Sequence, residues 1–298
     1  MGGGARLVML LGCLTAVSCG QPPTTAAIPS NAPATPVSIA PCKLPVASGD
    51  APVDGRAGDG TAGKGGFIQF PAANFSPDSA SLGDYDLGFT RWVPAFRAWV
   101  EPNGAHYAWA ENNTIHIIDV PSGADHAVTV PAPSVVVSYE NEGVYVAATS
   151  GQTTQGLGLI DAGGAYHSIT AGGVWSAIGG GAAYGQSQGK VSKLDLHSGA
   201  VTDVGTYQGT TQVLGATASV PLIAVTAGSQ YTIYAGTTSV YSGTAGDVAD
   251  PIGPAAADGS VEWFGSRGGA VWRWAGSGSV ARVASVAIGA VVIAGGCH

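Results

Sequence analysis

The feature that most constrains how this chain folds is a hairpin pattern, two short strands joined by a tight turn, which recurs from about residue 95. Six segments carry the pattern: residues 97–110, 135–147, 173–185, 212–225, 253–265 and 283–294. They begin at intervals of roughly 30 to 40 residues, as structural repeats do. No stretch shows the apolar period of a helix. The pattern therefore predicts an all-β chain.

A third strand is predicted after several of these hairpins. The clearest are residues 115–120, 157–161 and 191–196, which carry Asp119, Asp161 and Asp195 ahead of Gly123, Gly163 and Gly199. A carboxylate at a strand end can accept hydrogen bonds from backbone N–H groups of the turn, and glycine permits a positive φ. Residues 231–234 and 271–274 fill the same place in later repeats.

Repeats of this length, each with three or four short strands, are typical of the blades of a β-propeller. One such sheet buries its faces only by packing against its neighbours. The six repeats predict six blades, with five or seven as alternatives. The last repeat lacks its outer strands, and residues 65–70 form a strand outside any complete repeat. We expect this N-terminal strand to complete the last blade and close the ring.

The N-terminus has the layout of an export signal that ends in a lipid-attachment site. Arg6 precedes an apolar run at 7–14, which is far shorter than the roughly 20 residues that span a bilayer. Residues 16–19, Ala-Val-Ser-Cys, resemble the bacterial lipobox, with alanine where leucine is usual. An ordinary signal peptide is the alternative. We expect residues 1–18 to be a lipoprotein signal peptide and Cys19 to carry the lipid.

A proline-rich segment follows directly. Residues 20–41 contain many proline, alanine and threonine residues, a composition that stays semi-extended because it cannot bury enough apolar surface. We expect residues 19–41 to be a lipidated tether and residues 42–298 to be the propeller domain. This organisation predicts a lipid-anchored protein on the extracytoplasmic face of the cell membrane.

The positions of the four cysteines indicate a different role for each part of the chain. Cys13 lies in the signal and Cys19 is the lipid site, which leaves Cys42 and Cys297 at the two ends of the predicted domain. In an oxidising compartment these two are expected to form a disulfide. Such a bridge would stabilise the domain by about 4–5 kcal/mol in the chain-entropy treatment. It also requires the two ends of the domain to meet.

The charge balance limits the partners. The chain has 19 Asp and Glu against 11 Lys and Arg, a net charge of −8. This argues against a nucleic-acid backbone as partner and against a polybasic membrane patch. Only 10% of residues are charged and 47 are glycine, a composition for strands and tight turns.

The first repeat resembles a known family. It reads Trp-Val-Glu-Pro-Asn-Gly-Ala-His-Tyr-Ala-Trp-Ala at 99–110 and Ile-His-Ile-Ile-Asp-Val-Pro-Ser-Gly at 115–123. This resembles the WD40-like repeats of periplasmic β-propellers such as that of the Tol system, whose hairpins carry Ser-Pro-Asp-Gly. Over residues 42–298 the chain is similar to bacterial lipoproteins with such a propeller. The resemblance implies a fold and a location, and it assigns no catalytic residues.

Two short motifs suggest enzymes but lack the required context. Residues 185–189 match the Gly-x-Ser-x-Gly nucleophile elbow, which needs a helix after the serine. An alternating strand follows here, so Ser187 is predicted to lie in a hairpin turn. Residues 58–65 approach a P-loop, but Gly65 stands where Ser or Thr would bind Mg²⁺. We interpret this segment as a surface loop.

Candidate metal ligands are equally weak. Asp50, Asp54 and Asp59 lie among glycines, but the glutamate that closes a calcium loop is absent. His106, His116 and His126 fall on successive predicted strands without a sign of convergence. We therefore assign no metal and no cofactor.

Residues 90–99 form the most distinctive candidate binding surface. Arg91, Trp92, Arg97 and Trp99 lie close together in this segment, with Phe96 between them. Trp and Arg are typical anchors of binding surfaces, although Trp also packs between blades. A similar group contains Trp263, Trp272 and Trp274 with Arg267 and Arg273.

These observations favour a tethered propeller that binds a protein or ligand without catalysing a reaction. The expected partners are the membrane, through the lipid, and an envelope protein or glycan; we expect a monomer that does not bind nucleic acid. The alternative is an extracytoplasmic hydrolase or lyase acting on carbohydrate or peptide. Acids paired about 5–9 Å apart in the channel would favour a glycosidase. A channel lined by Gly, Ala and Val would favour binding.

Overall fold

Antiparallel strands make up nearly all of the regular structure. The computed structural model describes residues 38–49, 64–150, 153–216, 220–244, 251–258 and 261–298. Within these ranges the sole helix is a single 3₁₀ turn, η1 (Arg97–Trp99). None of the described residues belongs to a helix that is long and apolar enough to cross a membrane. The all-β prediction is confirmed.

Four sheets are simple meanders of four strands in chain order. The first contains β9 (Ser134–Glu140), β10 (Gly143–Ser150), β11 (Thr153–Asp161) and β12 (Tyr166–Thr170). The second contains β13 (Ala177–Gly179), β14 (Ala182–Ser187), β15 (Lys190–Asp195) and β16 (Val201–Thr206). The third contains β17 (Thr210–Ala216), β18 (Pro221–Ala227), β19 (Gln230–Ala235) and β20 (Thr238–Thr244). The fourth contains β21 (Pro251–Asp258), β22 (Val261–Ser266), β23 (Ala270–Trp274) and β24 (Ala281–Ser285).

Two smaller sheets precede these in the chain. One is the hairpin of β4 (Asp84–Asp86) and β5 (Arg91–Val93). The other contains β6 (His106–Glu111), β7 (Thr114–Asp119) and β8 (Asp125–Thr129). A single bridge between Val100 and Tyr107 adds a short inner position beside β6. Residues 97–99, expected as a strand, form η1 instead.

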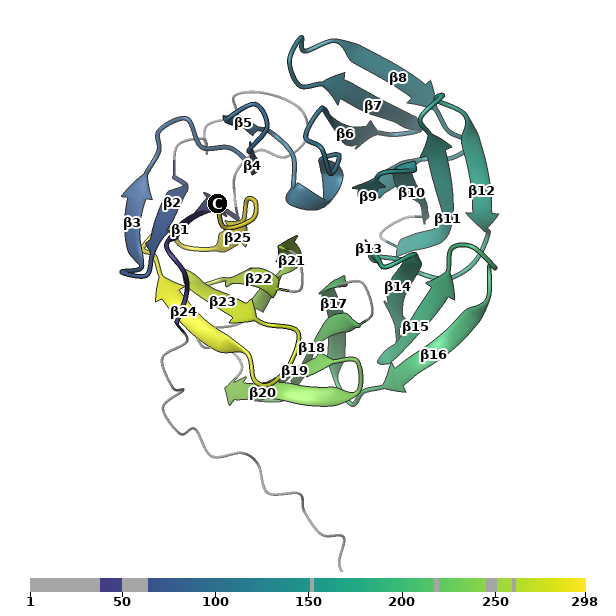
Figure 1. Ribbon diagram of the computed structural model, residues 1–298. Coiled ribbons are helices and arrows are strands. Elements are labelled where there is room, and N and C mark those ends of the chain that lie inside the picture. Colours follow the sequence, from purple (N-terminus) through teal and green to yellow (C-terminus); the bar gives the residue numbers. More distant parts are fainter. Residues whose placement is uncertain (1–37, 50–63, 151–152, 217–219, 245–250, 259–260) are drawn as a thin grey trace, which may run out of the picture. The chain divides into compact units, whose positions relative to one another are not determined.

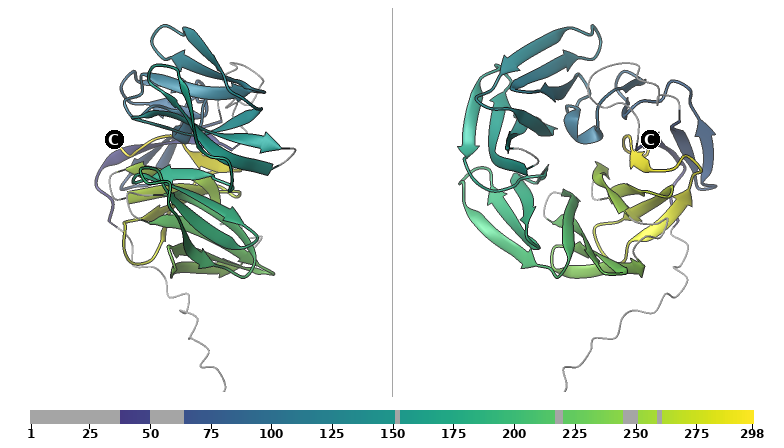
Figure 2. Two further views of the ribbon diagram at one scale, coloured as in Figure 1. Left: turned by 90° about the vertical axis from the view of Figure 1, so that its right-hand side faces the viewer. Right: turned by 180° about the vertical axis from the view of Figure 1, so that it is seen from behind.

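The remaining sheet combines both ends of the described chain. Its order is β25 (Val291–Ile293), β1 (Cys42–Ser48), β2 (Gly66–Phe70) and β3 (Asn74–Pro77). The strand expected at 65–70 is confirmed as β2, but β1, which was not predicted, lies between it and β25. The predicted Cys42–Cys297 disulfide is present, with Cα atoms 5.5 Å apart. Figure 2 shows the C-terminus beside this sheet.

In the sixth repeat the observed strand pairing differs from the prediction. Residues 283–294 were expected to form a hairpin, but β24 closes one sheet and β25 opens another. Two short apolar strands separated by glycine look the same in sequence whether they pair or cross to a new sheet. The hairpin prediction at this place is wrong.

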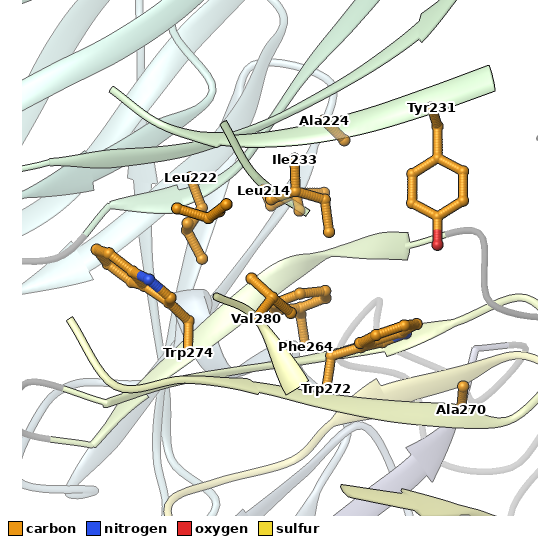
Figure 3. Close-up of a cluster of buried hydrophobic side chains, with 11 residues drawn as sticks. Leu214, Leu222, Ala224, Tyr231, Ile233, Phe264, Ala270, Trp272, Trp274 and Val280 are labelled. Atoms are coloured by element: carbon orange, nitrogen blue, oxygen red, sulfur yellow. The ribbon is translucent and has the colours of Figure 1, made fainter. Parts of the chain in front are cut away.

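Each sheet packs its apolar face against the next. Seven buried clusters join sheets that follow one another in the chain, and one of them joins the sheet of β21–β24 to the sheet of β25 and β1. Figure 3 shows one cluster, in which Leu222 and Ile233 of one sheet face Phe264 and Trp272 of the next. Figure 1 shows the sheets in chain order about a common centre, with β9, β13, β17 and β21 innermost.

The aspartates at the strand ends organise their turns as predicted. Oδ1 of Asp119, Asp161 and Asp195 accepts the backbone N–H of Ser122, Gly163 and Ser198 at 2.8, 2.9 and 2.7 Å. Hydrogen bonds to their side chains hold the pKa of all three carboxyls below the ordinary value. In the second turn it is Gly164, not Gly163, that has the positive φ, 79°.

The disulfide should make a large contribution to stability. It joins residues separated by 255 positions, so replacing both cysteines by serine should lower the free energy of unfolding by about 5 kcal/mol. Urea denaturation measures this. Reductant should lower the wild type to the level of the double variant and leave the double variant unchanged; equal stability of the two proteins would contradict the prediction.

Candidate ligand-binding cavity

A cavity of about 520 Å³ lies where the innermost elements meet. Its wall is formed by η1, by β9, β13 and β17, and by Ala255 and Ala256 of β21. These same elements contact one another in sequence order, and η1 contacts both β9 and β21. The volume falls within the range of about 300–1,000 Å³ that is usual for small-molecule sites.

Most of this wall is small and apolar. Val135, Val136 and Val137 contribute one side, and residues 213–216, Val-Leu-Gly-Ala, contribute another. Gly215 is required by close packing, since a Cβ there would lie 2.9 Å from the Cβ of Ala255. The wall therefore combines these apolar residues with polar side chains from η1, β9 and β14.

Arg97 supplies the positive charge of the cavity. It lies on η1, a turn closed by the hydrogen bond from the Trp99 N–H to the Phe96 carbonyl, and the rings of Phe96 and Trp99 pack edge to face at 4.9 Å. Its Nη1 lies 3.3 Å from Oδ2 of Asp84, and its side chain remains 30% exposed. Asp84 thus fixes one edge of the guanidinium, and the Arg97 side chain still lines the cavity.

Asp84 and Asp86 lie behind Arg97 on β4. Both are buried, and burial raises the pKa of Asp84 to about 7 although Arg97 acts in the opposite direction. Oδ1 of Asp86 accepts the N–H of Phe89 at 2.9 Å. Gly104, the last residue of the Glu-Pro-Asn-Gly turn, packs against this carboxylate so closely that a Cβ would clash with it. The close packing of this turn against Asp86 therefore requires glycine at position 104.

Glu140 supplies the negative charge. It lies at the end of β9, and its Oε1 accepts the Ser138 hydroxyl at 2.5 Å. Burial raises the pKa of this carboxyl above its ordinary value, the bond from Ser138 lowers it, and Arg97 is near enough to lower it further. Glu140 and Arg97 thus share one electrostatic environment.

Gln186 of β14 adds an amide. Its Oε1 accepts the Ser176 hydroxyl at 2.9 Å and the Val213 N–H at 3.4 Å. Because the carbonyl end is used by the protein, the NH₂ end is the group left to donate.

The residues of the predicted binding surface at 91–99 lie in different surroundings in the structure. Arg97 and Trp99 line the cavity, as does Phe96. Arg91 is exposed at the start of β5, whereas Trp92 is buried and donates from Nε1 to Oδ2 of Asp78 at 3.0 Å. Binding by these four residues stays a prediction, but they do not form one continuous lining.

The second aromatic group belongs to the core. Trp263, Trp272 and Trp274 are each at most 3% exposed. Trp272 and Trp274 lie in the cluster shown in Figure 3, and the Arg273 guanidinium lies 5.6 Å from the centre of the Trp263 ring. These residues hold sheets together.

The Gly-x-Ser-x-Gly match at 185–189 lies in a hairpin, as the sequence predicted. Ser187 ends β14, and Gln188 and Gly189, with φ of 49° and 79°, form the turn into β15. The hairpin prediction is confirmed. Cys19, Asp50, Asp54, Asp59 and most of the P-loop-like segment lie outside the described residues.

The three histidines lie on the adjacent strands β6, β7 and β8. His106 contacts Glu101 through Nδ1 at 2.7 Å, and His116 contacts Asp125 through Nδ1 at 2.8 Å. In the part of the chain that is described, no group of three or more His, Cys, Asp or Glu is arranged to hold a metal ion.

Sequence reasoning did not single out Asp84, Glu140 or Gln186. Glu140 was part of a predicted turn, and Gln186 belonged to the Gly-x-Ser-x-Gly match. Asp84 and Asp86 alternate on one strand, and a pair of acids on one face of a strand is a signal in the sequence that was not used. Their meeting with Arg97 depends on the fold.

No protein-family model matches the sequence, and no curated protein matches it. TolB from Acinetobacter baumannii is 11% identical, with a TM-score of 0.47 over 85% of this chain and 63% of TolB. AztD from Citrobacter koseri is 14% identical, with a TM-score of 0.43 over 84% and 82%. The computationally designed protein Ika8 is 13% identical, with a TM-score of 0.41 over 61% of each chain. This chain thus spans less than two thirds of TolB and of Ika8.

Asp84 should give stability a measurable dependence on pH. Its pKa is 3.8 in the ordinary case and about 7 here, so between these values the folded state holds a proton that the unfolded state has lost. The contribution of Asp84 to stability therefore falls as the pH rises from about 4 to about 7, and it is constant above that. Asp84→Asn removes this fall.

The test is urea denaturation of the wild type and Asp84→Asn from pH 4.5 to 8. The difference in the free energy of unfolding should shift in favour of the variant by a few kcal/mol, on the order of 1.4 per pKa unit. A difference that stays constant with pH would contradict the assignment.

Proposed function

We propose that this protein is a surface-tethered, extracytoplasmic β-propeller lipoprotein whose central cavity binds a ligand without chemical conversion. The observation that carries the proposal is the cavity of about 520 Å³, whose lining joins apolar residues to polar side chains that include Arg97, Glu140 and Gln186. Sites of this composition orient a small molecule with few polar contacts and hold it with apolar ones.

The proposed ring has seven positions. Seven buried clusters link the sheets in a cycle, and the hairpin of β4 and β5 takes part in two of them through Trp92 and Val93. Counting this hairpin as a reduced blade favours seven, the alternative count, over six. The sheet of β25, β1, β2 and β3 would close the ring in this arrangement.

Binding is favoured over hydrolysis by the lining of the cavity. Val135–Val137 and the Val-Leu-Gly-Ala segment at 213–216 form much of the wall, which is the lining that a binding channel was expected to have. Asp84 contacts Arg97 and is fully buried, so it does not reach a substrate as a general acid or nucleophile must. Among the described lining residues Glu140 is the single acid, whereas a glycosidase needs a pair.

The anchor rests on the sequence of the N-terminus. The apolar run, the small residues before Cys19 and the proline-rich spacer support a lipid at Cys19 and a position outside the cell membrane. We expect cells grown with an alkyne-labelled fatty acid to incorporate the label into the wild type and not into Cys19→Ala. Labelling of Cys19→Ala at the wild-type level would refute the anchor.

Filling the cavity should abolish ligand binding. Val135 lines the cavity and is 38% exposed, so Val135→Trp fills space without burying a new side chain in a packed core. Wild type incubated with small molecules from envelope extract should retain a species by native mass spectrometry, and Val135→Trp should lose it.

Val201 of the outer strand β16 is 57% exposed, and Val201→Trp is the matched control that should retain the species. Equal retention by Val135→Trp and the control would refute the cavity as the site, as would a wild type that retains nothing.

A further inference from the structure

Two opposite charges line the cavity without forming an ion pair with each other in the described structure. Arg97 comes from η1 and Glu140 from the end of β9, and both border the same space. The ion pair that Arg97 makes is with Asp84, which is fully buried and does not line the cavity, and the hydrogen bond that Glu140 accepts comes from its own strand. The cavity thus keeps a cation and an anion available for something else.

Each of these groups has unused bonding capacity. A guanidinium has five N–H donors, and the Asp84 contact engages Nη1. Glu140 uses Oε1 to accept from Ser138, which leaves Oε2 as its second acceptor. A ligand carboxylate can take two parallel bonds from a guanidinium, and a ligand ammonium can donate to a carboxylate oxygen.

The electrostatics favour a cationic group beside Glu140. A half-buried carboxylate loses hydration that nothing nearby fully replaces, and burial is the main influence on its pKa. An ammonium placed against Oε2 would restore that lost stabilisation. Arg97 is suited to bind an anionic group of the ligand. Asp84 fixes one edge of the guanidinium, which limits the conformational entropy lost when the other edge binds.

We propose that the cavity binds a zwitterion, a free amino acid or a short peptide with an apolar side chain. Its carboxylate binds Arg97, its ammonium binds Glu140, and its side chain packs against Val135, an exposed apolar side chain of the wall. This inference rests on the proposed binding function and names its ligand class.

A sugar fits the same lining less well. Sugars use aromatic ring faces, and the rings of the described lining pack against the protein, Tyr139 among them, which packs against the cluster between β6–β8 and β9–β12. Trp175 is 3% exposed, packs into a cluster between two sheets and donates from Nε1 to the Gly172 carbonyl. The rings of Phe96 and Trp99 pack against each other.

Ligands that differ by one charge test the proposal on the unaltered protein. Isothermal titration of the full chain in mild detergent compares L-leucine and leucyl-leucine with N-acetyl-leucine, leucinamide, N-acetyl-leucinamide and glucose. We expect leucine or leucyl-leucine to bind and the loss of either charge to weaken binding at least tenfold. Equal binding of N-acetyl-leucinamide, preference for glucose, or no binding of any zwitterion would overturn the proposal.

Variants then assign each charge. Glu140→Gln should weaken leucine binding about tenfold and leave the weak binding of N-acetyl-leucine unchanged, since that probe has no ammonium. Arg97→Gln should weaken both probes. The matched controls are Glu142→Gln and Arg267→Gln, which change exposed residues in turns outside the cavity and should bind leucine as the wild type does. If Glu140→Gln binds leucine as the wild type does, the proposal is wrong.

The two proposals fail in different ways. If Val135→Trp abolishes retention of a species from extract while leucine and leucyl-leucine do not bind the wild type, the cavity is a binding site and the zwitterion is wrong. If Val135→Trp leaves retention of that species intact, the cavity itself is wrong as the site.

Discussion

The packing of each small sheet against the next is the interaction on which the rest of this structure depends. In a repeat architecture, one sheet of three or four short strands cannot bury its apolar faces alone. The seven buried clusters supply the missing partner for each face, and residues such as Leu222, Ile233 and Phe264 have almost no exposed surface as a result. The inner strands are therefore fixed in position before any ligand is considered.

This constraint also explains the character of the cavity. The inner strands are held by clusters that lie farther out, so the residues that face the centre need only be small enough to fit. Valine, alanine and glycine form part of that lining, Glu140 lies at the end of the inner strand β9, and the positive charge comes from a place where the regular pattern is broken. Arg97 lies on the 3₁₀ turn η1, and its partner Asp84 lies on the short hairpin strand β4.

The sequence was a good guide to features that are local. The third strands, the aspartates that hold their turns and the hairpin at Ser187 depend on a few neighbouring residues, and all are present. The Cys42–Cys297 pairing also followed, because only two cysteines remained. Features that depend on distant contacts did not follow. Nothing beside Glu140 in the sequence indicates that Arg97 will lie near it, and β1 was not recognised because its partner β25 is at the other end of the chain.

The mixed origin of the sheet of β25, β1, β2 and β3 has a consequence for the order in which the protein acquires its structure. β1 is synthesised among the first described residues, yet one of its two neighbours is among the last. Until β25 arrives, one edge of β1 has unpaired N–H and C=O groups and the cluster around Leu44 and Ile68 is incomplete. Pairing across such a separation is slow compared with local hairpins. During that interval the open edge is the place where a second chain could pair by mistake.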